Sequence, residues 1–155
     1  MKSEDLEVYK YADELKRNIA VWTINFPKSI KYSYGEDLIN YSSNLISYIS
    51  LANSLVNDIR IRILVLCIAQ SELEKLKTTK RTLQFISSKI NSLSTKQFES
   101  FDILLGIIEG KLVSWKMNIL KSADTTNVKD LSGCFGSGGT NNLLELILEI
   151  LKLKL

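Results

Sequence analysis

The sequence predicts an all-α fold: an antiparallel up-down-up-down four-helix bundle at residues 1–121, a flexible linker at 122–142 and a short apolar amphipathic helix at 143–155. The length of 155 residues suits a single domain with a hydrophobic core. The first 105 residues contain one proline and one glycine, which leaves little to interrupt long helices. Apolar residues in this part recur mostly at steps of three and four, the spacing of one helical face.

The first predicted helix covers residues 4–24. One face of it carries apolar and aromatic residues at steps of three and four, which are Val8, Tyr11, Leu15, Ile19 and Trp22. Pro27 lacks an N–H and should end this helix. The serine at 33 or the Tyr-Gly pair that follows it offers a new start, because Glu36 and Asp37 favour a helix N-terminus electrostatically.

The second predicted helix runs from residue 35 or 36 to about residue 57. Its main seam consists of Leu38, Tyr41, Leu45, Tyr48, Ala52 and Leu55. A second apolar stripe lies beside the seam and consists of Ile39, Ile46, Ile49 and Val56. A helix covered on one side needs only one stripe, so the second stripe predicts contact with further copies of the chain in a homo-oligomer. Burial within the monomer is the alternative.

The third predicted helix covers residues 58–91 and is apolar all round at 63–69. Its later inward face consists of Leu73, Leu76, Leu83, Ile86 and Ile90. The opposite side carries three cations and one aromatic residue at every fourth position, here called the basic row: Lys77, Arg81, Phe85 and Lys89. We interpret Glu72 and Glu74, which flank the inward face, as solvated surface residues.

The fourth predicted helix has the most regular pattern in the chain. A break at 93–97 precedes it, where Ser94 and Gln97 fit a capping box. The seam has strict steps of three and four and consists of Phe98, Phe101, Leu105, Ile108, Leu112, Trp115 and Ile119. This spacing is typical of bundle packing of the coiled-coil type. Gly106 and Gly110 lie four residues apart and would permit a neighbouring helix to approach closely.

Residues 122–142 change in character, with many small and polar residues that predict a linker. The segment at 143–155 is strongly apolar apart from a polar stripe of Glu145, Glu149 and Lys152. It should therefore pack on the body of the protein, join a partner or touch a membrane surface. The Gly-Ser-Gly-Gly run at 136–139 also resembles an engineered linker, so an appended tail is an alternative.

The composition argues against catalysis. The chain has no histidine, which is the commonest general base and metal ligand. Cys67 and Cys134 match no CxxC spacing, and Cys67 is expected to be a buried small hydrophobe. The seams lack the inward Glu and Glu-x-x-His ligands of a di-iron bundle, and no Gly-Lys-Ser/Thr phosphate loop occurs. We therefore expect a non-enzymatic protein with no metal and no cofactor.

Nothing in the sequence predicts secretion or membrane insertion. The N-terminus is acidic and polar and does not resemble a signal peptide. The apolar run at 59–69 contains Arg60 and Arg62 and is too short to span a bilayer. The cysteines form no disulfide framework, which favours a reducing compartment. We expect a soluble, cytoplasmic protein with no membrane partner.

The positive charge is concentrated in one central segment. Residues 59–96 carry eight basic and two acidic groups (+6), residues 1–58 six and eight (−2), and residues 97–155 six and seven (−1). Such a segment predicts sequence-independent contacts with RNA or DNA phosphates, with Phe85 available for stacking or for a protein partner. The candidate nucleic-acid- and partner-binding residues are Lys28, Lys31, Arg60, Arg62, Lys77, Lys80, Arg81, Phe85 and Lys89. An ordinary solvated helix face is the alternative.

Several short motifs in residues 5–121 resemble one known family. They are Phe-Pro-Lys-Ser at 26–29, Tyr-Ser-Tyr-Gly-Glu at 32–36, Ala-Asn at 52–53, Ser-Glu-Leu-Glu-Lys-Leu at 71–76, Ile-Ser-Ser-Lys-Ile at 86–90 and the segment from Gly106 to Trp115. The family comprises four-helix-bundle proteins encoded in 23S ribosomal RNA intervening sequences and the accessory variability determinant proteins of diversity-generating retroelements. The chain departs from the family pattern in lacking histidine and in its tail after Lys121.

The resemblance implies an antiparallel four-helix bundle that assembles as a barrel-like homopentamer with a basic surface. For the retroelement branch, it implies binding to a reverse transcriptase and to nucleic acid during mutagenic copying of a template repeat. We favour this branch because of the basic third helix. The alternative is a purely structural oligomer, either an intervening-sequence protein or an engineered assembly component.

Overall fold

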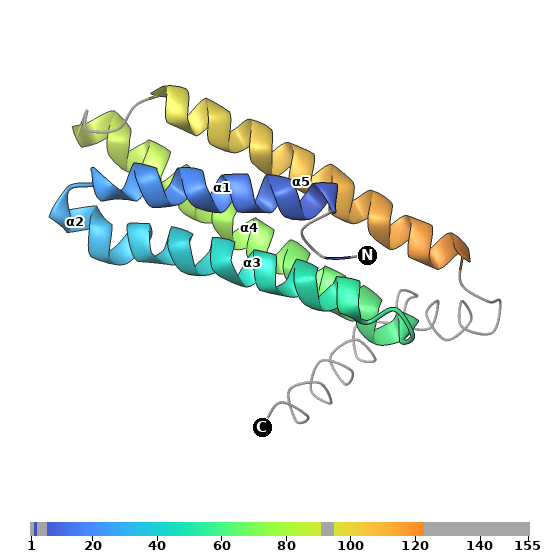
Figure 1. Cartoon of the computed structure of the whole chain (residues 1–155). Helices are drawn as coiled ribbons and strands as arrows, with labels where there is room; N and C mark the ends of the chain where they lie inside the picture. The colour runs from blue at the N-terminus through green and yellow to red at the C-terminus, as the bar shows by residue number, and fades with distance from the viewer. Residues whose placement is uncertain (1, 3–5, 91–94, 123–155) are drawn as a thin grey trace, which may run out of the picture.

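The computed structural model describes residue 2 and residues 6–90 and 95–122. These residues form helices and no strand, which confirms the all-α prediction (Figure 1). The helices are α1 (Glu7–Ile24), α2 (Lys28–Ile30), the π-helical turn η2 (Lys31–Gly35), α3 (Glu36–Ser54), α4 (Ile59–Ile90) and α5 (Thr95–Ser122). The predicted cap Ser94, the linker after Ser122 and the segment at 143–155 lie outside the described residues.

The four long helices pack around one shared core. α1 lies against α3 and α5, and α4 lies against the same two helices (Figure 1). The largest fully buried side chains come from all four helices and are Leu15, Ile19, Leu38, Leu45, Ile49, Ile63, Leu66, Leu73, Leu76, Leu83, Leu105 and Ile108. Burial of each such leucine or isoleucine contributes about 1.5–3 kcal/mol to stability, so this core is the main stabilising feature of the fold.

The predicted seams of the first and fourth helices lie in the core. Four of the five residues predicted to face inward on α1 are buried, and the fifth, Tyr11, is half-buried because Ala12 takes the innermost position. Six of the seven seam residues of α5 are buried, and Trp115 is half-buried. The three- and four-residue spacing therefore identified the buried faces of both helices.

The second apolar stripe predicted for the second helix is divided between core and surface. Ile49 is fully buried and Ile46 is half-buried, whereas Ile39 and Val56 are exposed in the single chain. Burial within the monomer thus accounts for part of this stripe. Val56 lies beyond the end of α3, in the four-residue turn that leads to α4.

The turn after α1 contains more helix than the sequence indicated. α1 ends at Ile24 before Pro27, and α3 begins at Glu36, both as predicted. Between them the carbonyl oxygen of Pro27 accepts hydrogen bonds from the N–H groups of Ile30 and Lys31 at 3.0 and 2.9 Å. Pro27 is the N-cap residue of this helical turn, which starts directly after it rather than at residues 33–35.

The turn between α3 and α4 is short and capped. Its predicted position at Asn57-Asp58 is correct, since α3 ends at Ser54 and α4 begins at Ile59. The carboxylate Oδ1 of Asp58 accepts a hydrogen bond from the N–H of Ile61 at 3.2 Å, which satisfies one free donor of the first turn of α4. Among the described helices, none combines the length and apolar character needed to cross a membrane.

Candidate nucleic-acid interface

Two of the predicted binding cations, Lys77 and Lys80, lie between α4 and α5 rather than on an open surface. The Nζ atom of Lys80 is 2.6 Å from Oδ1 of Asp102, and the Lys80 side chain is only 11% exposed. The ammonium of Lys77 contacts the carboxylates of Glu109 on α5 and Glu74 on α4. Both lysines are therefore neutralised by carboxylates, and their charge is less available to a phosphate.

The pKa of Lys77 reflects these contacts. Desolvation acts to lower the pKa, but the hydrogen bonds to Glu109 and Glu74 outweigh it, so the pKa is raised above the ordinary lysine value. Lys77 is thus a charged member of an ion-pair cluster at neutral pH. Its role in the described structure is to join α4 to α5.

The four residues of the basic row do not lie on one face of α4, because a step of four residues is slightly more than one turn of an α-helix. An α-helix has 3.6 residues per turn, so each four-residue step advances the side chain by about 40° around the axis. Over three steps the row rotates by about 120°, from Lys77 beside α5 to Lys89 in solvent. The row therefore leaves the helix interface as it approaches the end of α4.

The exposed part of the row consists of Arg81, Phe85 and Lys89, here called the α4 terminal patch. The Phe85 side chain is 68% exposed, and the Nζ atom of Lys89 lies 5.8 Å from the centre of its ring. Neither Arg81 nor Lys89 has an ion-pair partner among the described residues. Two unneutralised cations thus flank an exposed aromatic ring, a combination suited to phosphate contact and base stacking.

Lys28 and Lys31 lie in α2 and η2, at the same end of the molecule as the end of α4 and the start of α5 (Figure 1). Lys28 is exposed and Lys31 is half-buried. Lys96, in the first turn of α5, is also exposed at this end. Lys96 is not among the predicted binding residues, although its position in the basic segment could have indicated it.

Arg60 and Arg62 belong to the opposite end of α4. Arg60 is exposed, but Arg62 turns inward, where its Nε donates a hydrogen bond to the carbonyl oxygen of Ala52 at 2.9 Å. Its guanidinium also lies 5.3 Å from the ring centre of Trp115 on α5. Burial lowers the pKa of Arg62. The predicted binding residues therefore do not form one continuous surface.

The interpretation of Glu72 as a surface residue was wrong. Its side chain is 6% exposed, and Oε1 lies 2.9 Å from Nζ of Lys75. The hydrogen bond to Glu72 raises the pKa of Lys75, whose ammonium also lies 5.6 Å from the ring centre of Tyr41 on α3. Periodicity failed here because α3 covers a polar position of α4, whereas Glu74, two residues further on, is exposed as predicted.

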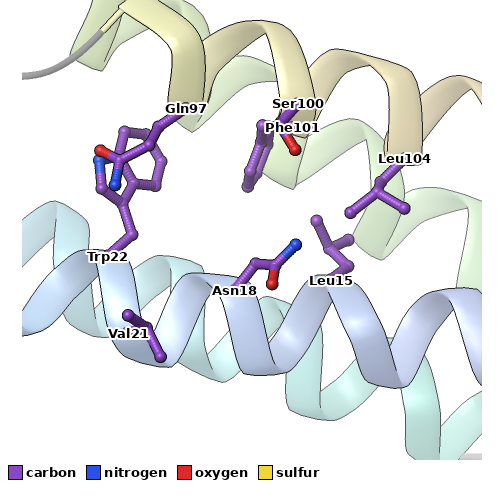
Figure 2. A pocket seen from close by; sticks show the side chains of 8 residues that line it. All are labelled: Leu15, Asn18, Val21, Trp22, Gln97, Ser100, Phe101 and Leu104. Carbon is purple, nitrogen blue, oxygen red and sulfur yellow. The ribbon is translucent and has the colours of Figure 1, made fainter.

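A cleft of about 300 Å³ opens between α1 and α5 (Figure 2). Trp22 and Gln97 lie at one end of it, Leu15 and Leu104 at the other, and Phe101 lies between them. Asn18, Val21 and Ser100 complete the lining. The lining contains no acid, base or thiol, so the cleft can hold an apolar group but supplies no catalytic one.

Trp22 in the cleft wall belongs to an aromatic cluster. Its ring meets those of Phe26 and Phe98 edge to face, with centroids 5.0 Å apart in both pairs. The buried Nε1 of Trp22 has no hydrogen-bond partner among the described residues. The sequence analysis placed Trp22 and Phe98 on inward-facing seams but could not predict their contact, because Phe98 is brought to Trp22 only by the packing of α5 on α1.

The described residues contain no group of three metal-binding side chains, so their geometry offers no candidate metal centre. Cys67 is half-buried on α4, and burial raises the pKa of its thiol, which disfavours the nucleophilic thiolate. No protein-family model matches the sequence. No curated protein matches it either.

Proposed function

We propose that this protein is a non-enzymatic accessory protein of a diversity-generating retroelement. In this proposal its four long helices form an antiparallel up-down-up-down bundle, and several copies assemble into a cytoplasmic homo-oligomer, a pentamer in the resembled family. The assembly binds a reverse transcriptase and the backbone of RNA or DNA during mutagenic copying. The α4 terminal patch is the surface that contacts nucleic acid.

The observation that carries the proposal is the exposure of Arg81, Phe85 and Lys89 without a neutralising carboxylate among the described residues. Backbone phosphates are recognised by charge alone, and an aromatic face stacks on any base. Lys28 and Lys96 at the same end of the molecule extend the positive surface. Such a surface binds without reading sequence, as expected for a protein that handles a copied template of changing sequence.

Exposed apolar side chains support assembly. Val21 and Ile24 on α1 and Ile103 on α5 are each more than 60% exposed in the single chain. Apolar side chains of this size gain stability when another subunit covers them. A closed oligomer would repeat the α4 terminal patch around a symmetry axis and turn a modest charge per chain into a strong positive field.

The second candidate function is a purely structural oligomer. The observation that favours it is the neutralisation of Lys77 and Lys80 by carboxylates of α5, which removes two of the predicted binding cations from the surface. In this alternative the exposed apolar residues serve assembly alone, and the α4 terminal patch is a solvated helix end.

The two functions are separated by measuring the binding of RNA and DNA oligonucleotides as a function of salt. The wild-type protein should lose affinity steeply as salt rises, because bound phosphates release counterions. Arg81→Glu combined with Lys89→Glu should weaken binding to all sequences and reduce the slope of log K against log salt by about two, one per lost phosphate contact.

The matched control is Lys10→Glu combined with Lys121→Glu, which makes the same change in net charge at exposed positions of α1 and α5 that have no ion-pair partner among the described residues. This control should keep most of the salt slope. Equal losses in both double variants would mean that only net charge matters, and an absence of binding at low salt would overturn the proposal in favour of the structural oligomer. Co-purification with the reverse transcriptase then tests the protein partner.

A further inference from the structure

A second groove, with a volume of about 610 Å³, runs along α5 at the place where α1 begins. Lys111 of α5 pairs with Glu7, the first residue of α1, at 2.7 Å. α5 continues for eleven residues beyond Lys111 to Ser122, and Trp115 there is only half-buried. The groove, here called the α5 groove, extends to both sides of this point, because Gly106, Ile107 and Gly110 lie before Lys111 and Ser114, Trp115 and Asn118 lie beyond it.

Gly106 and Gly110 line the α5 groove, and the described structure does not explain them. Both are exposed, and a Cβ atom added at either one would meet no other atom within 4 Å. Each glycine in a helix interior costs about 0.5–1 kcal/mol relative to alanine. Two such residues one turn apart would be explained by a helix that approaches the α5 backbone closely at this point.

The surface beside the glycines is apolar. Val113 and Met117 are 41% and 46% exposed, and Ile103 is more exposed than either. No charged residue interrupts this outer face of α5 between Glu99 and Lys121. The face therefore has the composition of a helix contact surface without a partner among the described residues.

We propose that the C-terminal segment of the same chain, residues 143–155, binds as a helix in the α5 groove. The segment is apolar except for Glu145, Glu149, Lys152 and Lys154. A 13-residue helix is about 20 Å long, and the part of the groove from Gly106 to Asn118 is about 18 Å long. The segment thus matches the groove in length, and its apolar side matches the exposed Ile103, Val113 and Met117 beside the glycines.

The intervening chain is long enough for this contact. The distance along the α5 axis from Ser122 back to Gly106 is about 24 Å. The 20 residues at 123–142 are rich in small and polar residues, and a chain of this kind spans roughly 22–27 Å on average. A linker of matched length gives an effective concentration in the millimolar range, so even a weak contact keeps the segment bound.

The proposal is tested in the full chain by amide hydrogen exchange of residues 143–155. Gly110→Gln should increase exchange of these amides at least tenfold, because the longer side chain occupies the groove, while the body gains helix propensity and stays folded. The control Asn44→Gln, at an exposed position of α3, should leave exchange unchanged. Unprotected segment amides in the wild-type protein would overturn the proposal.

A variant of the segment tests the same contact from the other side. Ile147→Asp places a charge opposite the polar stripe and should at least double the acrylamide quenching of Trp115, while Trp22 stays buried. Glu145→Asp, on the polar stripe, serves as its control. Light scattering should give the same mass for Ile147→Asp and wild type. A lower mass would show that the segment joins different chains, and unchanged quenching would show that the groove is empty; either result contradicts the proposal.

Discussion

The two halves of α4 have the same secondary structure but differ in how deeply their side chains are buried. In the first half, Ile63, Leu64, Val65, Leu66 and Ala69 are buried. In the second half, Leu83 is still buried, but Arg81, Phe85 and Lys89 are exposed. The difference follows from length: α4 has 32 residues and α3 only 19, so the last turns of α4 extend beyond α3 and have fewer neighbours. Helix length, as well as polarity, therefore decides which residues remain available for binding.

The largest effect is expected when one apolar residue in each half of α4 is replaced by alanine. Leu66→Ala should lower the free energy of unfolding by about 2–5 kcal/mol, because it leaves a cavity in a fully buried site. Phe85→Ala should change it by less than about 0.5 kcal/mol, since the ring is largely in solvent. Urea unfolding of both variants measures the contrast. Similar losses would mean that the end of α4 is covered by something beyond the described residues.

An intermediate effect is expected at the boundary between the halves, where Lys80 pairs with Asp102. Asp102→Ala leaves the largely buried ammonium of Lys80 without its carboxylate and should cost about 1 kcal/mol. Asp13→Ala breaks the more exposed pair with Arg17 and should cost only a few tenths of that amount. Chemical denaturation of the two variants compares them directly, and a larger loss for Asp13→Ala would contradict the assigned role of Lys80.

The smallest effect concerns pH. Because the folded pKa of Lys77 is raised, its stabilising contribution is fully present below the pKa of an unfolded lysine, about 10.4. That contribution is lost as the pH rises through the higher folded value. Glu109→Gln should therefore destabilise the protein more at pH 8 than at pH 11, as measured by urea unfolding at both values. An equal difference at the two pH values would mean that the pair does not stabilise the folded state.

The sequence alone predicted the all-α class, the bounds of the long helices to within a few residues, and most of the core. These features depend on local spacing: Leu105 and Ile108, for example, are three residues apart on one face. The sequence could not show which of the basic side chains stay exposed in the folded protein. Asp102 and Glu109, which neutralise Lys80 and Lys77, are more than twenty residues away in sequence and reach them only when α5 packs on α4.

The π-helical turn η2 has a consequence for chain length. Ile30 and Leu38 are both buried although eight residues separate them, a spacing that would set them about 80° apart in a regular α-helix. The wider turn at Lys31–Gly35 holds one residue more than an α-helical turn and brings the two side chains back towards the same side. Loss of a single residue here would rotate Pro27 and Ile30 relative to α3. The length of this turn is therefore constrained even where the identity of its exposed side chains, such as Tyr32 and Ser33, is not.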